Sequence, residues 1–558
     1  MNGLRSNLII LLIFLASATV IGRLFYFQVL NYQYWRAMAQ GQQNTFKEVL
    51  GERGEIFLEG NSLPVAQNRD ATFVYMSPAE IRDQENTVKI LSEILGRKEE
   101  LILEKLKNSG SLFELLKDNL SDQELEAINR QNLQGIYVGS KRQRYYPQGT
   151  LVSNILGFVD KNGDGQYGLE GYYNNILKGQ ENVLQGEKWP QGFLFFAGDN
   201  QGSDLNLTID YNIQFMSEKL LKNAVENLGA EGGQIIVVDP ASGAIIALAD
   251  YPNFDPNYYS DYSKEDWQIF KNSAAQDLFE PGSALKPITM AIGLEEGKIG
   301  PKTTYIDEGF VKFGGNTLYN YDGRKYGQQT MTQVLEKSIN TGAVFVEELI
   351  AHNVFIDYLN KFGLFEKTGI DTQEVFSENK ELKKGYDVNY ATAAYGQGIE
   401  MTSMQLMRAF CALVNGGKMP RLYLVDKITE NGKIVKTQPE FSDQIISSKT
   451  SSQVTAMMVS VVENGYGKAA KIPGYYIGGK TGTAQIPYSA LGINKSGYSE
   501  KTIQSFIGFG PAFLPKFVIL VKLDNPKAKT AEYSAVPVFQ DLAKYIINYW
   551  QLAPDYQL

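Results

Sequence analysis

One stretch of the sequence decides the fold class: residues 234–249, which run QIIVVDPASGAIIALA. Two apolar runs rich in isoleucine and valine flank the turn-forming residues 240–243, and this arrangement predicts a β-hairpin. An amphipathic helical pattern precedes the hairpin and ends near Leu228. We therefore expect a new domain to begin at about residue 206.

Further strand-like and helical patterns follow the hairpin. Strand-like runs lie at residues 475–485, 505–510 and 517–523. Helical patterns lie at residues 286–296, 332–351, 402–414 and 538–549. Strands at both ends of a domain with helices between them predict one antiparallel sheet, closed by the two chain ends and covered by helices, which is an α+β fold.

The region before the hairpin has a different texture. Residues 29–205 mix short β-like runs with helical patterns at 87–96 and 121–130, which predicts an elongated α+β region. Within it, Asp160, Asn162, Asp164 and Gly165 imitate a calcium-binding EF-hand loop. The twelfth position is Gly171 and the acidic residue, Glu170, falls one place early, so a glycine-rich turn is favoured over a calcium site.

The N-terminus carries the longest apolar run of the chain. Residues 8–22 are apolar or small apart from one serine and one threonine, and the run resumes after Arg23. A membrane-spanning helix over residues 8–28 is favoured, with a cleaved signal peptide as the alternative. Arg5 before the run favours a short N-terminus inside the cell and the bulk of the chain outside.

These patterns divide the chain into five parts. They are a cytoplasmic stub (1–7), a transmembrane anchor (8–28), an elongated α+β domain (29–205), a second domain built around the hairpin (206–553) and a tail (554–558).

Composition excludes several classes of function. The 558 residues are 43% apolar and 21% charged, as in ordinary globular proteins, and the net charge of −9 argues against nucleic-acid binding. The chain has one cysteine, Cys411, and one histidine, His352. An intramolecular disulfide is therefore impossible and a His/Cys zinc site has too few ligands, so we expect no structural metal. We expect Cys411 to lie in an apolar helix core and His352 at a surface or helix end.

Residues 279–287, FEPGSALKP, place a serine and a lysine where a helix begins. Ser283 and Lys286 are three residues apart and so share a helix face, and Pro287 is tolerated only near a helix start. A serine there lies at free backbone N–H groups that favour a developing anion. A desolvated lysine loses its proton readily and can accept the serine proton. The alternative is a helix cap followed by a surface lysine.

The segment Ser338-Ile339-Asn340 follows an amphipathic run. Its hydroxyl and carboxamide can relay a proton and hold a substrate amide, although alone the segment describes only a polar helix boundary.

Residues 478–484, GGKTGTA, lie in a strand-like setting. An edge strand carrying Lys480, Thr481 and Thr483 can pair with an extended peptide and bind its terminal carboxylate. A glycine-rich turn is the alternative.

A second alternative for the same region is a phosphate-binding loop. Residues 474–481 spell the complete P-loop string as GYYIGGKT. Bulky residues occupy 475–477, where a phosphate cradle needs small ones, and no apolar strand feeds the loop, so the strand is favoured.

The three motifs occur in the order found in penicillin-recognising serine enzymes. Further segments extend the match along nearly the whole chain, at residues 23–29, 53–56, 144–147, 157, 168–170, 395–398 and 535–539. The chain resembles a class B penicillin-binding protein, a monofunctional peptidoglycan D,D-transpeptidase. The resemblance implies a serine β-lactamase-like catalytic domain on a membrane-anchored pedestal.

The resemblance also implies the catalytic residues. Ser283 would attack the penultimate D-alanine of a stem peptide ending in D-Ala-D-Ala and release the last D-alanine. Lys286 would accept the serine proton, Ser338 and Lys480 would complete the proton path to the leaving amine, and Asn340 would hold the donor amide.

The resemblance implies that the third motif, at residues 478–484, binds the substrate. Thr481, Gly482 and Thr483 would bind the substrate, the two threonines through its carboxylate, and the backbone N–H groups of Ser283 and Thr483 would form the oxyanion hole. β-Lactams would acylate the same serine. No cofactor or metal is implied.

The implied setting is bacterial cell-wall synthesis. Partners would be a glycan polymerase of the shape, elongation, division and sporulation (SEDS) class and other wall-synthesis or division proteins. Asparagine at 340 and the short stub favour a division-type (septal) role over an elongation-type role. A D,D-carboxypeptidase, a β-lactam-hydrolysing relative, a drug sensor and an inactive scaffold of a wall-synthesis complex are the alternatives.

Overall fold

The computed structural model of the chain describes residues 14, 17–21, 23, 44–50, 52–60, 64–109, 111, 113–179, 181–189, 192–195, 201–313 and 315–557. The predicted anchor, residues 8–28, lies mostly outside this set. Within the described part of the chain, no helix combines the length and the apolar character that crossing a membrane requires.

The chain forms two compact units. The first contains β1 (Asn44–Leu50), β8 (Glu181–Trp189) and β9 (Gly192–Phe195), which make an antiparallel sheet in the order β1-β8-β9. The second contains Glu55–Leu177 and Asp204–Leu558, and all elements named below belong to it.

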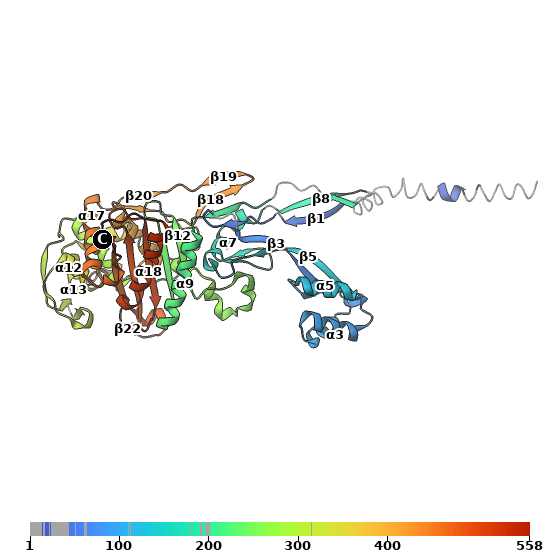
Figure 1. Ribbon diagram of the computed structural model, residues 1–558, viewed down its shortest axis with the longest axis horizontal. Coiled ribbons are helices and arrows are strands. Elements are labelled where there is room, and N and C mark those ends of the chain that lie inside the picture. The colour runs from blue at the N-terminus through green and yellow to red at the C-terminus, as the bar shows by residue number, and fades with distance from the viewer. Residues whose placement is uncertain are drawn as a thin grey trace, which may run out of the picture. The chain divides into compact units, whose positions relative to one another are not determined.

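A small helix-covered sheet opens the second unit (Figure 1). The long strand β3 (Pro64–Met76) pairs antiparallel with β4 (Glu114–Lys117) and β5 (Ile136–Tyr145). Val74 and Met76 of β3 are fully buried in a core shared with the helices α3 (Gln84–Leu95), α4 (Glu99–Leu106) and α5 (Asp122–Gln131). The helices predicted at 87–96 and 121–130 are thereby confirmed.

The same strand belongs to a larger sheet that joins segments far apart in the sequence. Its order is β19-β18-β10-β2-β3-β4, with β5 on β3. In this sheet β2 (Ile56–Phe57) runs parallel to β10 (Asp204–Leu207), and β10 pairs antiparallel with β18 (Val425–Glu430), which pairs with β19 (Lys433–Lys436). Strands from before and after the expected domain boundary at residue 206 therefore share one sheet.

A buried ion pair joins the end of β5 to a short helix that follows it in the chain. The Nε of Arg144 donates to Oε1 of Glu170 at 2.7 Å, and the two side chains are 4% and 0% exposed. The Tyr146 hydroxyl donates to the same oxygen at 3.3 Å. Glu170 lies in the short helix α7 (Gly168–Tyr172), so this pair fixes α7 against the end of β5.

The loop that imitates an EF-hand forms a tight turn between β6 (Phe158–Val159) and β7 (Gly165–Gln166). Oδ1 of Asp160 accepts the backbone N–H groups of Asn162 and Asp164, at 2.8 and 3.0 Å. The turn interpretation is confirmed. Within the described residues, no group of three or more His, Cys, Asp or Glu side chains is arranged to hold a metal ion.

The predicted hairpin and the C-terminal strands form one five-stranded antiparallel sheet. Its order is β12-β11-β23-β22-β21. The strands are β11 (Gly232–Val238), β12 (Ile245–Tyr251), β21 (Gly478–Pro487), β22 (Tyr498–Gly510) and β23 (Phe517–Asp524). Strands from both ends of the domain meet in the middle of this sheet, as predicted, and β21 is an edge strand.

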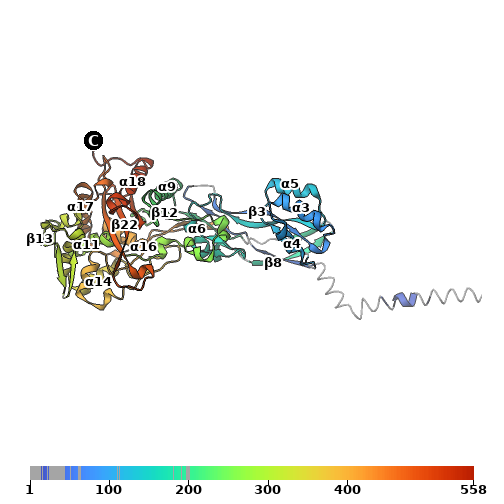
Figure 2. The same ribbon diagram turned by 90° about the horizontal axis from the view of Figure 1, so that it is seen from below.

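Helices cover both faces of the sheet (Figure 2). On one face lie α9 (Tyr211–Leu228) and α18 (Ala535–Tyr549). On the other face lie α11 (Lys286–Glu295), α16 (Ser403–Val414) and α17 (Ser448–Asn464). These helices match the predicted patterns within a few residues, except that α17 was not predicted.

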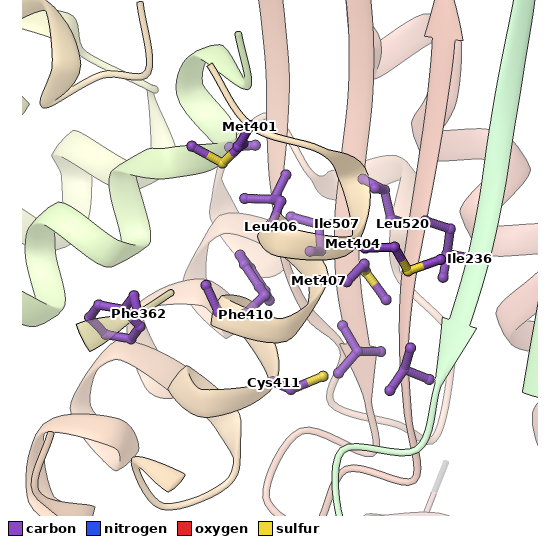
Figure 3. Packing of buried hydrophobic residues seen from close by; sticks show 14 of the residues in the cluster. Ile236, Phe362, Met401, Met404, Leu406, Met407, Phe410, Cys411, Ile507 and Leu520 are labelled. Atoms are coloured by element: carbon purple, nitrogen blue, oxygen red, sulfur yellow. The ribbon is translucent and has the colours of Figure 1, made fainter. Parts of the chain in front are cut away.

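Helix α16 is buried along its whole length because two different surfaces enclose it. Met404, Met407 and Cys411 project toward Ile507 and Leu520 of the sheet (Figure 3). Cys411 is fully buried, as predicted.

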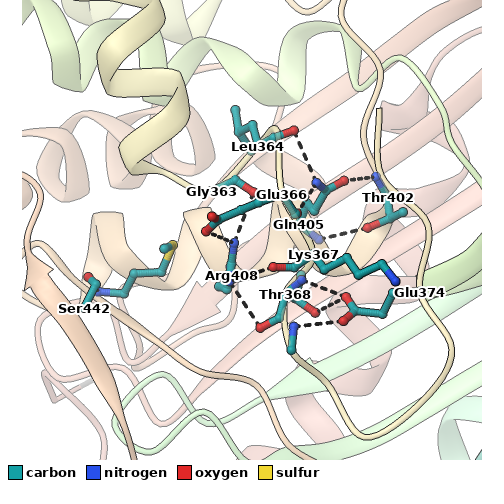
Figure 4. A network of polar contacts seen from close by, with 12 residues as sticks. Gly363, Leu364, Glu366, Lys367, Thr368, Glu374, Thr402, Gln405, Arg408 and Ser442 are labelled. Atoms are coloured by element: carbon teal, nitrogen blue, oxygen red, sulfur yellow. Dashed lines mark hydrogen bonds and ion pairs between the residues drawn. The ribbon is translucent and has the colours of Figure 1, made fainter. Parts of the chain in front are cut away.

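The opposite side of α16 carries polar anchors (Figure 4). Arg408 donates to the carbonyl oxygens of Gly363 and Thr368 at 3.1 and 3.2 Å and lies 3.2 Å from a carboxylate oxygen of Glu366. The loop after residue 362 is thereby attached to the helix core.

The prediction of one continuous helix over residues 332–351 is wrong. The structure has two helices, α12 (Met331–Glu336) and α13 (Asn340–Glu348). Ser338 between them has φ +54°, a left-handed conformation that ends an α-helix. A third helix, α14 (His352–Lys361), begins at His352, which is the predicted helix-end position.

Candidate active site

The structure places Ser283 at the start of a buried helix. It lies in the single turn η5 (Gly282–Leu285), which runs directly into α11 at Lys286. Pro287 takes the first turn of α11, where its missing N–H costs nothing. Ser283 lines a cleft, whereas the Lys286 side chain on the next turn is fully buried.

Two glycines allow backbone to pack closely around this serine. Gly396 has φ +83°, and a Cβ atom there would lie 2.0 Å from the carbonyl oxygen of Gly282. A Cβ atom at Gly482 would lie 2.9 Å from the carbonyl oxygen of Pro281. The turn of Ser283 is thus held between β21 and the loop of residues 395–398, and a side chain at either glycine would displace it.

The Lys286 amine has well-defined partners. Its Nζ donates to the backbone oxygen of Ser338 at 2.6 Å and to Oδ1 of Asn340 at 2.8 Å. Both are acceptors only, and a neutral amine has two N–H donors and one lone pair. The two acceptors can therefore take both donors and leave the lone pair free to accept a proton.

The second lysine approaches from the opposite side of Ser338. The Lys480 Nζ donates to Ser338 Oγ at 2.9 Å and to the backbone oxygen and Oγ1 of Thr481 at 2.9 and 3.2 Å. Ser338 Oγ also lies 3.4 Å from the Lys286 Nζ. One hydroxyl therefore bridges two amines, which is the arrangement that a proton relay needs.

Burial changes the acidity of both amines. Desolvation, and then the charge of Lys480, hold the pKa of Lys286 well below that of an ordinary lysine. Desolvation lowers the pKa of Lys480 to about 7. Among the described residues, all hydrogen-bond partners of the two amines are neutral oxygens, so no carboxylate holds their protons in place.

The third motif lies on the edge strand β21, which pairs on one side only, with β22. Thr481 and Thr483 both line the cleft, and Thr483 Oγ1 accepts the backbone N–H of Ala531 at 3.4 Å. Since Lys480 and Thr481 lie within a strand rather than in a loop leading into a helix, the phosphate-loop alternative is wrong.

One contact at the site, between Asn340 and the segment that ends at Tyr319, could not be predicted from the sequence. The Nδ2 of Asn340 donates to the backbone oxygen of Tyr319 at 3.0 Å. Tyr319 ends the hairpin of β14 (Phe310–Phe313) and β15 (Asn316–Tyr319). No motif marks residue 319, because it contributes only a carbonyl oxygen.

The cleft has a volume of about 900 Å³ and contains Ser283, Ser338 and Asn340. Its walls carry several aromatic side chains, at residues 319, 321, 326, 395, 466 and 533. The structure thus brings together all eight residues predicted from the motifs. They are a serine that lines the cleft, two desolvated amines, a hydroxyl that bridges the amines, and a strand edge that is unpaired among the described residues.

Comparison with known families agrees with this chemistry. Residues 233–544 match the penicillin binding protein transpeptidase domain, and residues 48–192 match the penicillin-binding protein dimerisation domain. The chain belongs to the penicillin-binding protein transpeptidase family. The family resemblance inferred from the motifs is confirmed.

Relatives of this penicillin-binding protein match over most of their length. Stage V sporulation protein D of Bacillus subtilis is 34% identical over 493 residues, which cover 85% of this chain and 74% of the relative. A peptidoglycan D,D-transpeptidase FtsI homolog of Mesostigma viride is 30% identical over 589 residues, which cover 99% and 96%.

Among solved structures, penicillin binding protein 2X from Streptococcus thermophilus shares the fold of this penicillin-binding protein. The TM-score is 0.72 at 22% identity, with 90% of this chain and 80% of that chain covered.

Proposed function

We propose that this chain is a peptidoglycan D,D-transpeptidase that cross-links stem peptides in the bacterial cell wall. One observation carries the proposal: the buried Lys286 amine, three residues along the chain from Ser283, contacts only neutral oxygens of Ser338 and Asn340 among the described residues. A serine with such a base is an activated nucleophile. The names of the relatives support peptidoglycan as the substrate.

In the acylation step, Ser283 Oγ attacks the carbonyl carbon of the penultimate D-alanine. Its proton passes to the Lys286 Nζ, and the carbonyl oxygen becomes an oxyanion held by the backbone N–H groups of Ser283 and Thr483. Such an oxyanion hole contributes roughly 10²- to 10³-fold per donor.

Collapse of the tetrahedral intermediate breaks the C–N bond to the last D-alanine. The leaving amine takes a proton from Ser338 Oγ, and Lys480 or the protonated Lys286 replaces that proton. The distances of 2.9 and 3.4 Å from Ser338 Oγ to the two amines support this path. An amine of a second stem peptide then attacks the ester and regenerates Ser283.

Substrate binding uses the free edge of β21. An extended stem peptide adds to this edge as a further strand, and its terminal carboxylate binds to the hydroxyls of Thr481 and Thr483 near Lys480. The glycine at 482 supports the proposal, because it lets β21 lie against the turn of Ser283. Asn340 holds the donor amide through its carboxamide.

The remaining assignments extend this function. Residues 8–28 anchor the protein in the cell membrane with residues 1–7 inside, 29–205 form the pedestal, 206–553 the catalytic domain outside, and 554–558 a tail. The apolar run at the N-terminus supports the anchor. We place the enzyme in septal synthesis, which a relative named as an FtsI homolog supports. We further propose a SEDS-class glycan polymerase as its partner, on the family resemblance alone.

The experiment is labelling of the purified protein with a fluorescent penicillin, followed by mass mapping of the adduct. We expect stable label on Ser283 that Ser283→Ala abolishes. In a second assay with a stem peptide ending in D-Ala-D-Ala and an amine acceptor, we expect a cross-linked product. Rapid release of hydrolysed penicillin would instead identify a β-lactamase. Transfer of the acyl group to water alone would identify a carboxypeptidase. No label on the folded protein would contradict the proposal.

A further inference from the structure

A fully buried carboxylate, Asp307, lies behind the wall of the active site. It ends the strand β13 (Thr304–Asp307), and its side chain has no exposed surface. A buried carboxylate is costly unless hydrogen bonds compensate its charge. The donors around Asp307 therefore indicate what it holds.

Four donors converge on this carboxylate from different segments. Oδ1 accepts the Thr341 hydroxyl at 2.6 Å and the Gly309 N–H at 3.0 Å, and Oδ2 accepts the Tyr326 N–H at 2.7 Å. The Asn320 Nδ2 donates to both oxygens, at 2.9 and 3.0 Å. Asp307 thus joins both ends of the segment from 309 to 326 to the first turn of α13.

A second hydrogen bond doubles this connection. The backbone N–H of Thr341 donates to Oδ1 of Asn320 at 3.1 Å. Thr341 is therefore fixed through both its hydroxyl and its backbone. The neighbours of these two residues, Asn340 and Tyr319, make the contact that faces the cleft.

We propose that Asp307 is a positioning residue of the transpeptidase, acting through Asn320 and Thr341 to hold Asn340 against Lys286. The inference rests on the proposed function, in which the Lys286 amine accepts the Ser283 proton and must therefore be held in position. The Asn340 Oδ1 is one of the two acceptors that occupy the N–H donors of the Lys286 amine. If Asn340 moves, the amine loses this acceptor and with it one of the contacts that fix its position.

The test compares two substitutions at Thr341. Thr341→Val keeps the shape and removes the hydroxyl that donates to Asp307, whereas Thr341→Ser keeps the hydroxyl. We expect the rate constant for acylation by a fluorescent penicillin to fall at least tenfold in Thr341→Val, with a shifted pH dependence, and to stay within threefold of wild type in Thr341→Ser. Asp307→Asn, which turns an amide toward these donors, should lower the rate further.

Asp371 offers a matched control. It is also buried, and it accepts the backbone N–H groups of Leu424 and Val425 and the Tyr173 hydroxyl, but it lines no part of the cleft. Asp371→Asn should lower the melting temperature without changing acylation of the folded protein. An unchanged rate and pH profile in Thr341→Val, with wild-type protein still labelled on Ser283, would overturn this inference and leave the proposed function standing. Loss of label in wild type would overturn the function itself.

Discussion

Two of the regions that bury cations compensate the buried charge in opposite ways. Near the end of β5, Arg144 lies 2.7 Å from the carboxylate of Glu170. At the active site, Lys286 and Lys480 are equally buried, but their partners among the described residues are carbonyl, amide and hydroxyl oxygens. A matched carboxylate keeps a buried cation charged and inert, whereas neutral acceptors favour its loss of the proton.

The comparison explains why a base can exist here at neutral pH. A neutral arginine does not occur in proteins, so a buried Arg144 requires Glu170. A lysine can shed its proton instead, and burial together with the second lysine lowers the pKa of Lys286. The first region therefore contributes stability and the second contributes reactivity.

The largest expected effect is on catalysis at Lys286. Lys286→Met keeps the volume and removes the amine, so acylation by a fluorescent penicillin should slow by about 10²- to 10⁴-fold. The free energy of unfolding should change by no more than about 1–2 kcal/mol, because removing a desolvated amine offsets two lost hydrogen bonds. Stopped-flow labelling and urea denaturation measure the two quantities. Large destabilisation without slower acylation of the folded protein would break the comparison.

The opposite outcome is expected at Arg144. Arg144→Met removes the cation that lies 2.7 Å from the buried Glu170 carboxylate and should lower the free energy of unfolding by about 3–5 kcal/mol. The acylation rate of the folded fraction should stay at the wild-type value.

A double variant provides the control for this pair. Arg144→Met combined with Glu170→Leu removes both charges, and it should recover most of the lost stability. If Glu170→Leu does not restore stability, the loss in Arg144→Met does not come from the buried charge of Glu170, and the comparison is wrong.

The motifs predicted which residues meet at the cleft but not the groups that hold them in place. The spacing of Ser283 and Lys286 decides that both face one side of a helix, and local sequence is enough for that conclusion. The carbonyl of Tyr319, at the end of the β14–β15 hairpin, and the carboxylate of Asp307, at the end of β13, contact Asn340 and Thr341 at the start of α13. Such long-range contacts have no periodic signal in the sequence.

The same limit applies to secondary structure. The five-stranded sheet could be predicted because apolar strands and turn residues are local signals. The break between α12 and α13 was missed, because the left-handed conformation of Ser338 contradicts the helical pattern around it. That break carries the hydroxyl to the two lysines, so the missed feature is part of the site.

A smaller effect is expected at Glu280, a buried acid that pairs with no cation among the described residues. Burial raises its pKa to about 7, although the Tyr498 hydroxyl donates to both carboxylate oxygens, at 3.0 and 3.2 Å. A raised pKa means that stability is fully present below the unfolded pKa of about 4.5 and is lost as pH rises through about 7. Glu280→Gln should therefore gain roughly 2 kcal/mol relative to wild type between pH 5 and pH 8.

Denaturation of both proteins at the two pH values measures this difference. Tyr498→Phe removes the donating hydroxyl, so the pH at which the stability contributed by Glu280 is lost should rise. Identical pH dependence in wild type and Glu280→Gln would contradict the assignment.

The most direct test of the central claim is the pH dependence of the second-order rate constant for acylation, which reports the free enzyme. The account predicts that acylation begins far below pH 10.5, because burial and the charge of Lys480 lower the pKa of Lys286, and declines above about pH 7, the lowered pKa of Lys480. A rate that rises continuously toward pH 10.5, as for an ordinary lysine, would contradict the account.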